Sequence, residues 1–270
     1  MPNPETLPPD TLPLAPLPEF DDAALTHDAF LCGKLHLWQP IRGYRAATDP
    51  VLLAAACPAR AGERVLDIGC GAGAAALCLG ARVPGLVLAG LEVQPAYATL
   101  ARRNAQENNL TMQVETGDLI RMPAALRLDF DHVIANPPYY RAGGTRSPDP
   151  TRAMALQVET PLSAWVQAAA QRLTPGGWLT LICGADGLPE VLLAMAGKLG
   201  DVSVLPLQPR TGRAAQRILL RARKGRKGAF RLLAPFVLHQ GVAHDGDRES
   251  YAPRANAVLR EGADLSAEFG

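Results

Sequence analysis

The sequence predicts an α/β protein with a doubly wound, mostly parallel sheet, and three observations support this fold class. From Glu63 onward, short apolar segments alternate with helical segments of about 10–15 residues, which is typical of βαβ units. The first apolar segment ends in a glycine-rich turn, as strands before ligand-binding helices often do. Hydrophobic residues make up 48% of the 270 residues, which is enough to bury a sizeable core. Collagen-like, coiled-coil and wholly disordered chains are excluded.

The composition also indicates where in the cell the protein is expected to be. No stretch approaches the roughly 20 apolar residues of a membrane-spanning helix. No Lys or Arg precedes Lys34, and no apolar segment near the N-terminus has the pattern of a secretory signal. The five cysteines are odd in number and show no C-x-x-C spacing, which argues against disulfides and a zinc site. We therefore expect a cytoplasmic, single-subunit protein without a membrane or metal partner.

The N-terminal part is expected to form two segments. Residues 1–28 are rich in proline and acids and are interpreted as a disordered leader. Residues 29–62 are interpreted as an extension that lines the functional site. Within it, partial alternation over 31–46 predicts a short hairpin. A helix follows over 48–57, with Thr48 as its cap and a proline in its first turn.

Residues 63–228 are expected to form the main domain, and 229–270 a C-terminal extension. Apolar runs predict strands at 64–68, 86–91, 112–115, 130–135, 178–183, 202–207 and 217–222. Helical patterns predict helices at 74–83, 95–108, 162–173 and 188–199, with one more near 255–260. The Thr-Pro-Gly-Gly sequence at 174–177 predicts a turn before the fifth strand. Strands separated by helices imply right-handed parallel crossovers.

The turn after the first strand predicts a nucleoside site. Gly69, Gly71 and Gly73 let the backbone approach a ligand closely, and the following helix presents backbone N–H groups. Glu92 lies 19 residues beyond Gly73 at the end of the second strand, where an acid can accept both hydroxyls of a ribose. Cys70 is interpreted as a small filler whose backbone N–H contacts the cofactor, and not as a nucleophile.

The charges of nearby side chains indicate which nucleoside cofactor the site would bind. Asp67 precedes the first glycine by two residues and would repel the pyrophosphate of a nicotinamide dinucleotide. S-adenosyl-L-methionine has no phosphate there and carries cationic sulfonium and ammonium groups. Asp118, after the third strand, is placed to accept a hydrogen bond from an adenine amino group. Val93 and Leu119, beside Glu92 and Asp118, are further expected cofactor contacts.

The most specific motif follows the fourth strand and reads Asn136-Pro-Pro-Tyr139. The carboxyl edge of an open α/β sheet is where ligands bind. An exocyclic amine or amide is a poor nucleophile because its lone pair is delocalised. If the Asn136 side-chain oxygen and the Pro137 carbonyl each accept an N–H, the lone pair can turn toward a sulfonium methyl. Tyr139 offers an aromatic face to a planar group, and Pro138 and Tyr140 are expected to line the same pocket.

Together these motifs resemble the class I S-adenosylmethionine-dependent methyltransferases that act on planar nitrogen, and more closely the bacterial tRNA(Val) adenine-N6 methyltransferase family. The segment 45–53 (RAATDPVLL) is similar to a family segment, although Ala47 stands where the family usually has glycine. The resemblance spans about residues 31–225 and implies a Rossmann-like, seven-stranded sheet ending in an antiparallel strand. It implies cofactor contacts at Asp67, Gly69, Gly71, Glu92 and Asp118, amine contacts at Asn136, Pro137 and Tyr139, and a pocket lined by Thr48 and Asp49.

Basic residues favour an RNA partner. The first 33 residues hold six acids and no Lys or Arg, so the remainder sets 27 basic against 20 acidic residues, a net +7. Residues 210–231 contain nine Lys/Arg and no acid. Clustered cations can contact phosphates. RNA contacts are expected from Arg223, Lys224, Arg226 and Lys227, and from a second cluster that contains Arg141, Arg146 and Arg152.

The sequence therefore predicts an S-adenosylmethionine-dependent enzyme that methylates an exocyclic nitrogen, with adenine N6 in tRNA as the expected target. Alternatives that use the same motif are the glutamine N5 of a protein such as a release factor, or an rRNA base. A nucleotide-binding oxidoreductase would leave the Asn136 motif without a purpose. A non-catalytic RNA-binding scaffold would not need Asn136 and Glu92. His132, which alternates with apolar neighbours, is expected to be structural.

Overall fold

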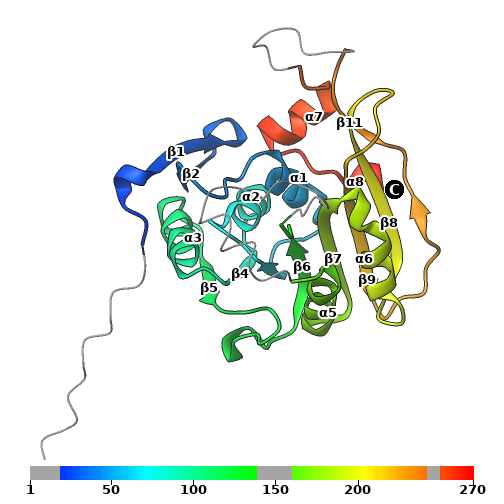
Figure 1. Cartoon of the computed structure of the whole chain (residues 1–270), viewed down its shortest axis with the longest axis horizontal. Coiled ribbons are helices and arrows are strands. Elements are labelled where there is room, and N and C mark those ends of the chain that lie inside the picture. The colour runs from blue at the N-terminus through cyan, green and yellow to red at the C-terminus, as the bar shows by residue number, and fades with distance from the viewer. Residues whose placement is uncertain (1–18, 139–159, 242–249) are drawn as a thin grey trace, which may run out of the picture.

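The computed structural model describes residues 19–138, 160–241 and 250–270. Its centre is a nine-stranded sheet in the order β10-β8-β9-β7-β6-β3-β4-β5, with β11 also paired to β8 (Figure 1). The strands are β3 (Arg64–Ile68), β4 (Val87–Glu92), β5 (Met112–Thr116), β6 (Phe130–Ala135), β7 (Leu173–Gly184), β8 (Leu199–Arg210), β9 (Arg217–Lys224), β10 (Arg231–Leu232) and β11 (Phe236–His239). Among these described strands, only β9 runs antiparallel to its neighbours. The predicted fold class is confirmed, and β10 and β11 extend the expected seven strands.

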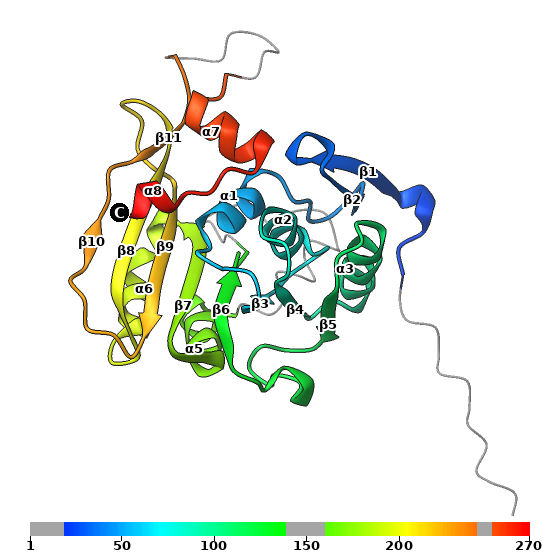
Figure 2. The same ribbon diagram turned by 180° about the vertical axis from the view of Figure 1, so that it is seen from behind.

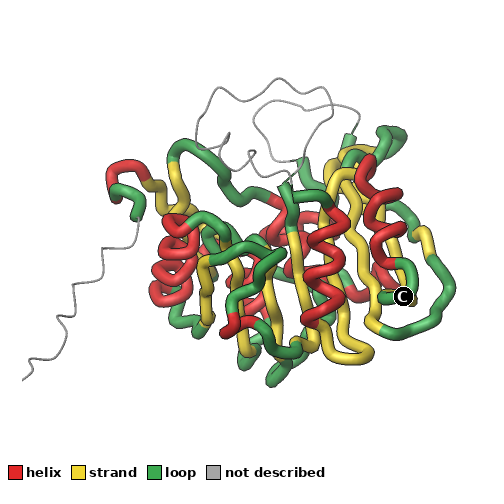
Figure 3. The backbone as a smooth tube through the Cα atoms, turned by 60° about the horizontal axis from the view of Figure 1, so that its bottom comes forward, coloured by secondary structure: helices red, strands yellow, loops and turns green. Residues whose placement is uncertain are grey.

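Helices cover both faces of this sheet (Figure 3). One layer contains α1 (Thr48–Ala56), α2 (Ala74–Arg82) and α3 (Pro95–Glu107), and the other contains α5 (Leu162–Arg172) and α6 (Leu188–Met195). The two layers bury separate apolar clusters against the sheet. This two-sided burial explains why the strands are nearly continuous apolar runs.

The N-terminal hairpin lies earlier than predicted. It pairs β1 (Leu25–Phe30) with β2 (Leu35–Pro40), so the expected hairpin over 31–46 and the leader boundary at residue 28 are both wrong. The break at Gly33 forms the turn between the strands, where residues 31–33 all have positive φ. The residues before 29 are rich in acids, and apolar and polar residues alternate only weakly in β1. The sequence pattern therefore did not indicate a strand there.

Three other elements differ from the prediction. Residues 174–177 do not precede β7 but bulge within it, where its register against β6 shifts. The helix expected over 188–199 ends at Met195 because Ala196 is extended and Gly197 has a φ of 73°. Thr48 does not cap α1, since Ala47 occupies the cap position without a side-chain hydrogen bond.

The C-terminal extension packs against α1 (Figure 2). It contains α7 (Pro253–Asn256), a π-helical turn at Ala257–Glu261 and α8 (Ser266–Phe269). Arg221 is 5% exposed, donates to the Ala56 carbonyl at the end of α1, and lies 3.8 Å from the centre of the Phe269 ring. A cation at a helix C-terminus is favourable, so this arginine of the basic segment supports the fold and is not a surface residue.

Within the described ranges, no helix combines the length and apolar character needed to cross a bilayer.

Candidate active site

Four strands of the sheet end in register at one edge. Ile68 of β3 pairs with Leu91 of β4 on one side and with Ala135 of β6 on the other. Glu92 pairs with Thr116 of β5. Because these strands are parallel, the segments that follow them meet at the same carboxyl edge. The glycine turn, Glu92, Asp118 and Asn136 all belong to those segments, as predicted.

The glycine turn requires its glycines. Gly69, Gly71 and Gly73 have φ values of 71°, 55° and 88°, which L side chains rarely adopt. A Cβ on Gly69 would lie 2.5 Å from the Trp165 ring, which is 8% exposed and comes from α5. The turn is therefore pressed against α5, and Trp165 forms part of its support.

Cys70 contributes packing, and its backbone is already engaged. The Cys70 N–H donates to the Leu91 carbonyl at 3.0 Å, so the predicted contact of this N–H with a cofactor is wrong. The thiol lies 2.8 Å from the position of a Cβ built on Gly90, between β3 and β4. Burial raises the pKa of the Cys70 thiol well above its usual value, which keeps it protonated. Its role as an inert filler fits this position.

Glu92 is held rigidly. It is 6% exposed, and its two carboxylate oxygens accept hydrogen bonds from the Gly71 and Gln94 N–H groups, each at 2.9 Å. Burial raises the pKa of Glu92, while these hydrogen bonds lower it. Each carboxylate oxygen has a further lone pair, so the group can also accept hydrogen bonds from ribose hydroxyls.

Asp67 is a buried carboxyl at the base of the pocket. It is 2% exposed and accepts one hydrogen bond from the Ala76 N–H at 3.2 Å. Burial, followed by the nearby charge of Glu92, raises the pKa of Asp67 to about 8. A ligand that brings positive charge to this pocket would offset that cost. The buried carboxyl therefore fits a cationic cofactor and disfavours a pyrophosphate.

Asp118 follows β5 beside Glu92, since the Gly117 N–H donates to the Glu92 carbonyl at 2.9 Å. The Asp118 Oδ1 atom accepts from the Ile120 N–H at 2.8 Å and fixes the turn. Leu119 packs partly against the core, whereas Val93 and Ile120 are 60% and 65% exposed. These two exposed apolar side chains can cover a planar ring. Ile120 was not predicted from the sequence, although its position next to Asp118 and Leu119 could have indicated it.

Asn136 lines the same pocket as the glycine turn. The cavity encloses about 350 Å³, its open mouth included, and is lined by Tyr44, Ala46, Pro50, Asp67, Gly69 and Asn136 among others. The Asn136 Nδ2 atom donates to the Tyr44 hydroxyl at 3.1 Å. Pro137 is buried and Pro138 exposed. Tyr139, Tyr140, Arg141, Arg146 and Arg152 lie outside the described residues. Tyr44 escaped sequence reasoning because its link to Asn136 spans 92 residues.

Thr48 and Asp49 do not line the described part of this cavity, whereas Ala46 and Pro50 on either side of them do. Asp49 pairs instead with Arg217 at the start of β9. The pair joins the first turn of α1, where an acid is favourable, to the sheet edge that carries the site. Asp49 therefore positions the pocket wall.

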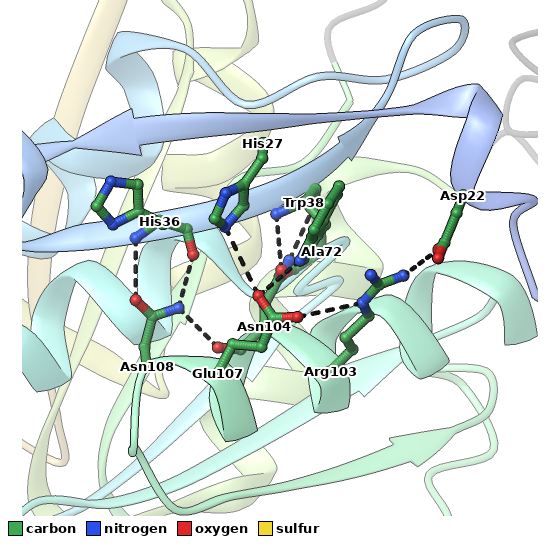
Figure 4. A network of polar contacts seen from close by, with 9 residues as sticks. All are labelled: Asp22, His27, His36, Trp38, Ala72, Arg103, Asn104, Glu107 and Asn108. Carbon is green, nitrogen blue, oxygen red and sulfur yellow. Dashed lines mark hydrogen bonds and ion pairs between the residues drawn. The ribbon is translucent and has the colours of Figure 1, made fainter.

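A buried amide ties the N-terminal hairpin to the glycine turn (Figure 4). Asn104 of α3 is fully buried; its Oδ1 accepts from the Trp38 N–H at 2.8 Å, and its Nδ2 donates to the Trp38 and Ala72 carbonyls at 3.0 and 2.9 Å. One turn further, at the C-cap of α3, Asn108 makes the same pair of bonds to the His36 backbone. The two side chains thus satisfy the free edge of β2 as a neighbouring strand would.

The basic tip, residues 223–227, lies at the ends of the strands opposite to those that carry the site. Arg223 pairs with Trp178 near the amino end of the parallel strands, while Arg217, about 20 Å away along β9, is at the site edge. The Arg223 guanidinium donates to the Gly176 carbonyl, and Lys224 donates to the Leu173 carbonyl at 2.6 Å. Of the four expected RNA contacts on this tip, these two stabilise the strand, and Arg226 and Lys227 are exposed.

His132 lies inside β6, away from the site. It is 3% exposed, and its Nε2 atom lies 2.8 Å from a Glu63 carboxylate oxygen. Burial lowers the pKa of His132, and Glu63 partly offsets this effect. Its position at the amino half of the strand agrees with a structural role.

Comparisons with known proteins place these features in context. A family model described as the Methyltransferase small domain matches residues 47–206. A tRNA1(Val) (adenine(37)-N6)-methyltransferase of Porphyromonas gingivalis is 34% identical over 178 residues, which cover 60% of this chain and 69% of that protein. A release factor glutamine methyltransferase of Geobacter sulfurreducens is 31% identical over 157 residues, covering 55% and 54%. The crystal structure of a predicted O-methyltransferase from Agrobacterium tumefaciens aligns with a TM-score of 0.65 and 25% identity, over 80% of this chain and 98% of that one.

Proposed function

The chain belongs to the Methyltransferase small domain family, and we propose that it transfers a methyl group from S-adenosylmethionine to the exocyclic N6 of an adenine in tRNA. It is an S-adenosylmethionine-dependent N-methyltransferase. The observation that carries the proposal is the meeting of Asn136 and the glycine turn in one pocket. The relative from Porphyromonas gingivalis, by its name, methylates this atom of adenine 37.

The described residues fit this cofactor. The buried carboxyl of Asp67 fits its positive charge, and Glu92 has the lone pairs to accept ribose hydroxyls. The exposed Val93 and Ile120 side chains fit an adenine ring beside Asp118. S-adenosylmethionine, when bound, supplies a methyl group on a positively charged sulfur. These residues would hold it at the carboxyl edge, next to Asn136.

Asn136 and Pro137 prepare the amine. The nitrogen of an adenine amino group shares its lone pair with the ring and is a weak nucleophile. When the Asn136 Oδ1 atom and the Pro137 carbonyl each accept one N–H, the nitrogen becomes more tetrahedral and its lone pair is freed. Fixed acceptors of this kind stabilise the positive charge that develops on nitrogen without reorganising. Catalysis then consists of positioning and preorganised polarity, without a covalent enzyme intermediate.

A second candidate substrate is the side-chain amide of a protein glutamine. The relative from Geobacter sulfurreducens carries the name of a release factor glutamine methyltransferase. An amide NH2 is also planar and also donates two N–H bonds, so the same two acceptors fit it. The alignment with that protein covers 54% of its length, against 69% for the tRNA-modifying relative, which favours tRNA.

Mass spectrometry distinguishes these substrates. The purified protein is incubated with S-adenosylmethionine and unmodified tRNA, rRNA or a release factor, and the digested products are analysed. We expect N6-methyladenosine in tRNA and no methylated glutamine. Methylation of the release factor alone, or of rRNA alone, would overturn the tRNA proposal while leaving the amine chemistry intact.

The raised pKa of Asp67 predicts a pH-dependent stability. Its folded pKa of about 8 exceeds the ordinary 3.8, so the folded protein holds this proton more tightly than the unfolded chain does. The stability that this proton provides is complete below about pH 4 and is lost as the pH rises toward 8. Relative to Asp67→Asn, the wild type without cofactor should lose about 1.4 kcal/mol per pH unit across that window. Denaturant unfolding at several pH values measures this, and a pH-independent difference between the two proteins would contradict it.

We further propose that Arg226 and Lys227 contact tRNA phosphates away from the reacting base. Both are exposed, and a large folded RNA can reach beyond one edge of the sheet. The double substitution Arg226→Ser, Lys227→Ser should weaken tRNA binding and reduce the slope of log K against log salt by about 0.7–0.9 for each phosphate that is no longer neutralised. Filter binding at several salt concentrations measures both quantities. If affinity and slope stay unchanged, the tip is only solvated surface.

A further inference from the structure

Tyr44 stands between the two halves of the active site. It lies in the loop after β2, and its hydroxyl accepts the hydrogen bond from Asn136 Nδ2 at 3.1 Å. On its other side, the ring lies 3.6 Å from the position of a Cβ built on Gly71. Tyr44 therefore lies beside the glycine turn and is bonded to the side chain proposed to hold the amine.

We propose that Tyr44 is a positioning residue that turns the Asn136 carboxamide so that its oxygen, and not its nitrogen, faces the target amine. This inference rests on the proposed use of Asn136 as an acceptor. A carboxamide keeps its shape when it rotates by half a turn, but the two orientations present opposite hydrogen-bonding groups. In the wrong orientation, the NH2 group would meet the N–H bonds of the substrate. Removing that orientation would make Asn136 a more effective acceptor.

The surroundings of Tyr44 keep its hydroxyl protonated. Although 46% of the residue is exposed, local burial of the phenol and then the charges of Asp49 and Asp67 raise its pKa. The phenol thus keeps its proton. In the structure its oxygen accepts the Asn136 N–H, and this arrangement leaves the carboxamide oxygen for the target amine.

The loop around Tyr44 is held on both sides. The Tyr97 hydroxyl donates to the Tyr44 carbonyl at 3.0 Å. The Ala46 N–H donates to the buried Gln39 side chain at 2.7 Å, and Arg45 pairs with Asp28 of β1 at the same distance. Such backbone support is what a positioning residue needs, because a mobile hydroxyl would not hold the amide.

Two cofactor analogues test this without any RNA. Sinefungin carries an amine in place of the methyl group, and this amine donates hydrogen bonds into the space of the target nitrogen. S-adenosylhomocysteine lacks both groups. We expect Tyr44→Phe to weaken sinefungin about three- to tenfold in calorimetry and to leave S-adenosylhomocysteine within about twofold. In an Asn136→Ala background, where no carboxamide remains, Tyr44→Phe should not weaken sinefungin further.

The outcomes separate cleanly. Equal weakening of both analogues, no weakening of sinefungin, or the same loss in the Asn136→Ala background would each overturn the role of Tyr44. Tyr251→Phe serves as a matched control, because this tyrosine stacks on His239 beside β11, and it should change neither affinity. Since no nucleic acid is present, failure to methylate tRNA would refute the proposed substrate and leave this test unaffected.

Discussion

Replacing Asn136 by alanine is expected to lower turnover by roughly two to three orders of magnitude, as the loss of one preorganised polar group can. The substitution removes one of the two proposed acceptors of the target amine, so the nitrogen lone pair stays delocalised. The proposed cofactor contacts at Asp67 and Glu92 remain, and the affinity for S-adenosylmethionine should be nearly unchanged. Single-turnover methyl transfer and calorimetry measure the two effects separately.

A matched control for this variant is Asn256→Ala. Asn256 lies in α7 of the C-terminal extension, outside the pocket. It should keep both the turnover and the cofactor affinity of the wild type. Unchanged methyl transfer in Asn136→Ala would remove this residue from the mechanism, and a parallel loss of cofactor affinity would place it in cofactor binding instead.

Replacing Asn104 by leucine is expected to reduce the free energy of unfolding by about 2–5 kcal/mol, because it leaves buried backbone groups without partners. The side chain now satisfies the N–H and carbonyl of Trp38 and the carbonyl of Ala72. A leucine of similar size fills the space but accepts and donates nothing. Denaturant unfolding monitored by circular dichroism measures the loss.

Asn108→Ala is the matched comparison on the same helix face. Asn108 makes the same two bonds to the His36 backbone, but on the exposed part of the network, where water can replace it. We expect it to cost less than about 1.5 kcal/mol. An equal loss of unfolding free energy in the two variants would show that neither the burial of Asn104 nor its bond to the glycine turn determines how much it stabilises the fold.

The central sheet and the proposed cofactor side of the site were predictable because their signals are local. The strands at Arg64–Ile68 and Phe130–Ala135 are continuous apolar runs, and the structure has them within the predicted bounds. The glycine turn and Glu92 follow directly from the strands that place them. Parallel strand ends meet at one edge, so residues distant in sequence could be brought together by topology alone.

The N-terminal contribution was not predictable in the same way. Tyr44 and Asn104 act through contacts that span many residues, and no local pattern marks a tyrosine that meets an asparagine 92 positions later. The hairpin itself was shifted, because a strand of six residues within an acid-rich segment has too weak an alternation to stand out.

The basic segment shows a different limit of sequence reasoning. A run of cations without acids is typical of a phosphate-binding surface, but long side chains can also turn back to the protein. Arg210 and Arg221 are buried, and Arg223 and Lys224 donate to backbone carbonyls. Which cations stay free depends on nearby carbonyls from other strands, and these are known only once the sheet is assembled.

The most direct test of this account is a crystal structure of the protein with sinefungin. The amine nitrogen of the analogue is expected about 3 Å from both the Asn136 side-chain oxygen and the Pro137 carbonyl oxygen, with its ribose on Glu92. An amine that points away from these two oxygens, or an analogue bound elsewhere on the protein, would contradict it.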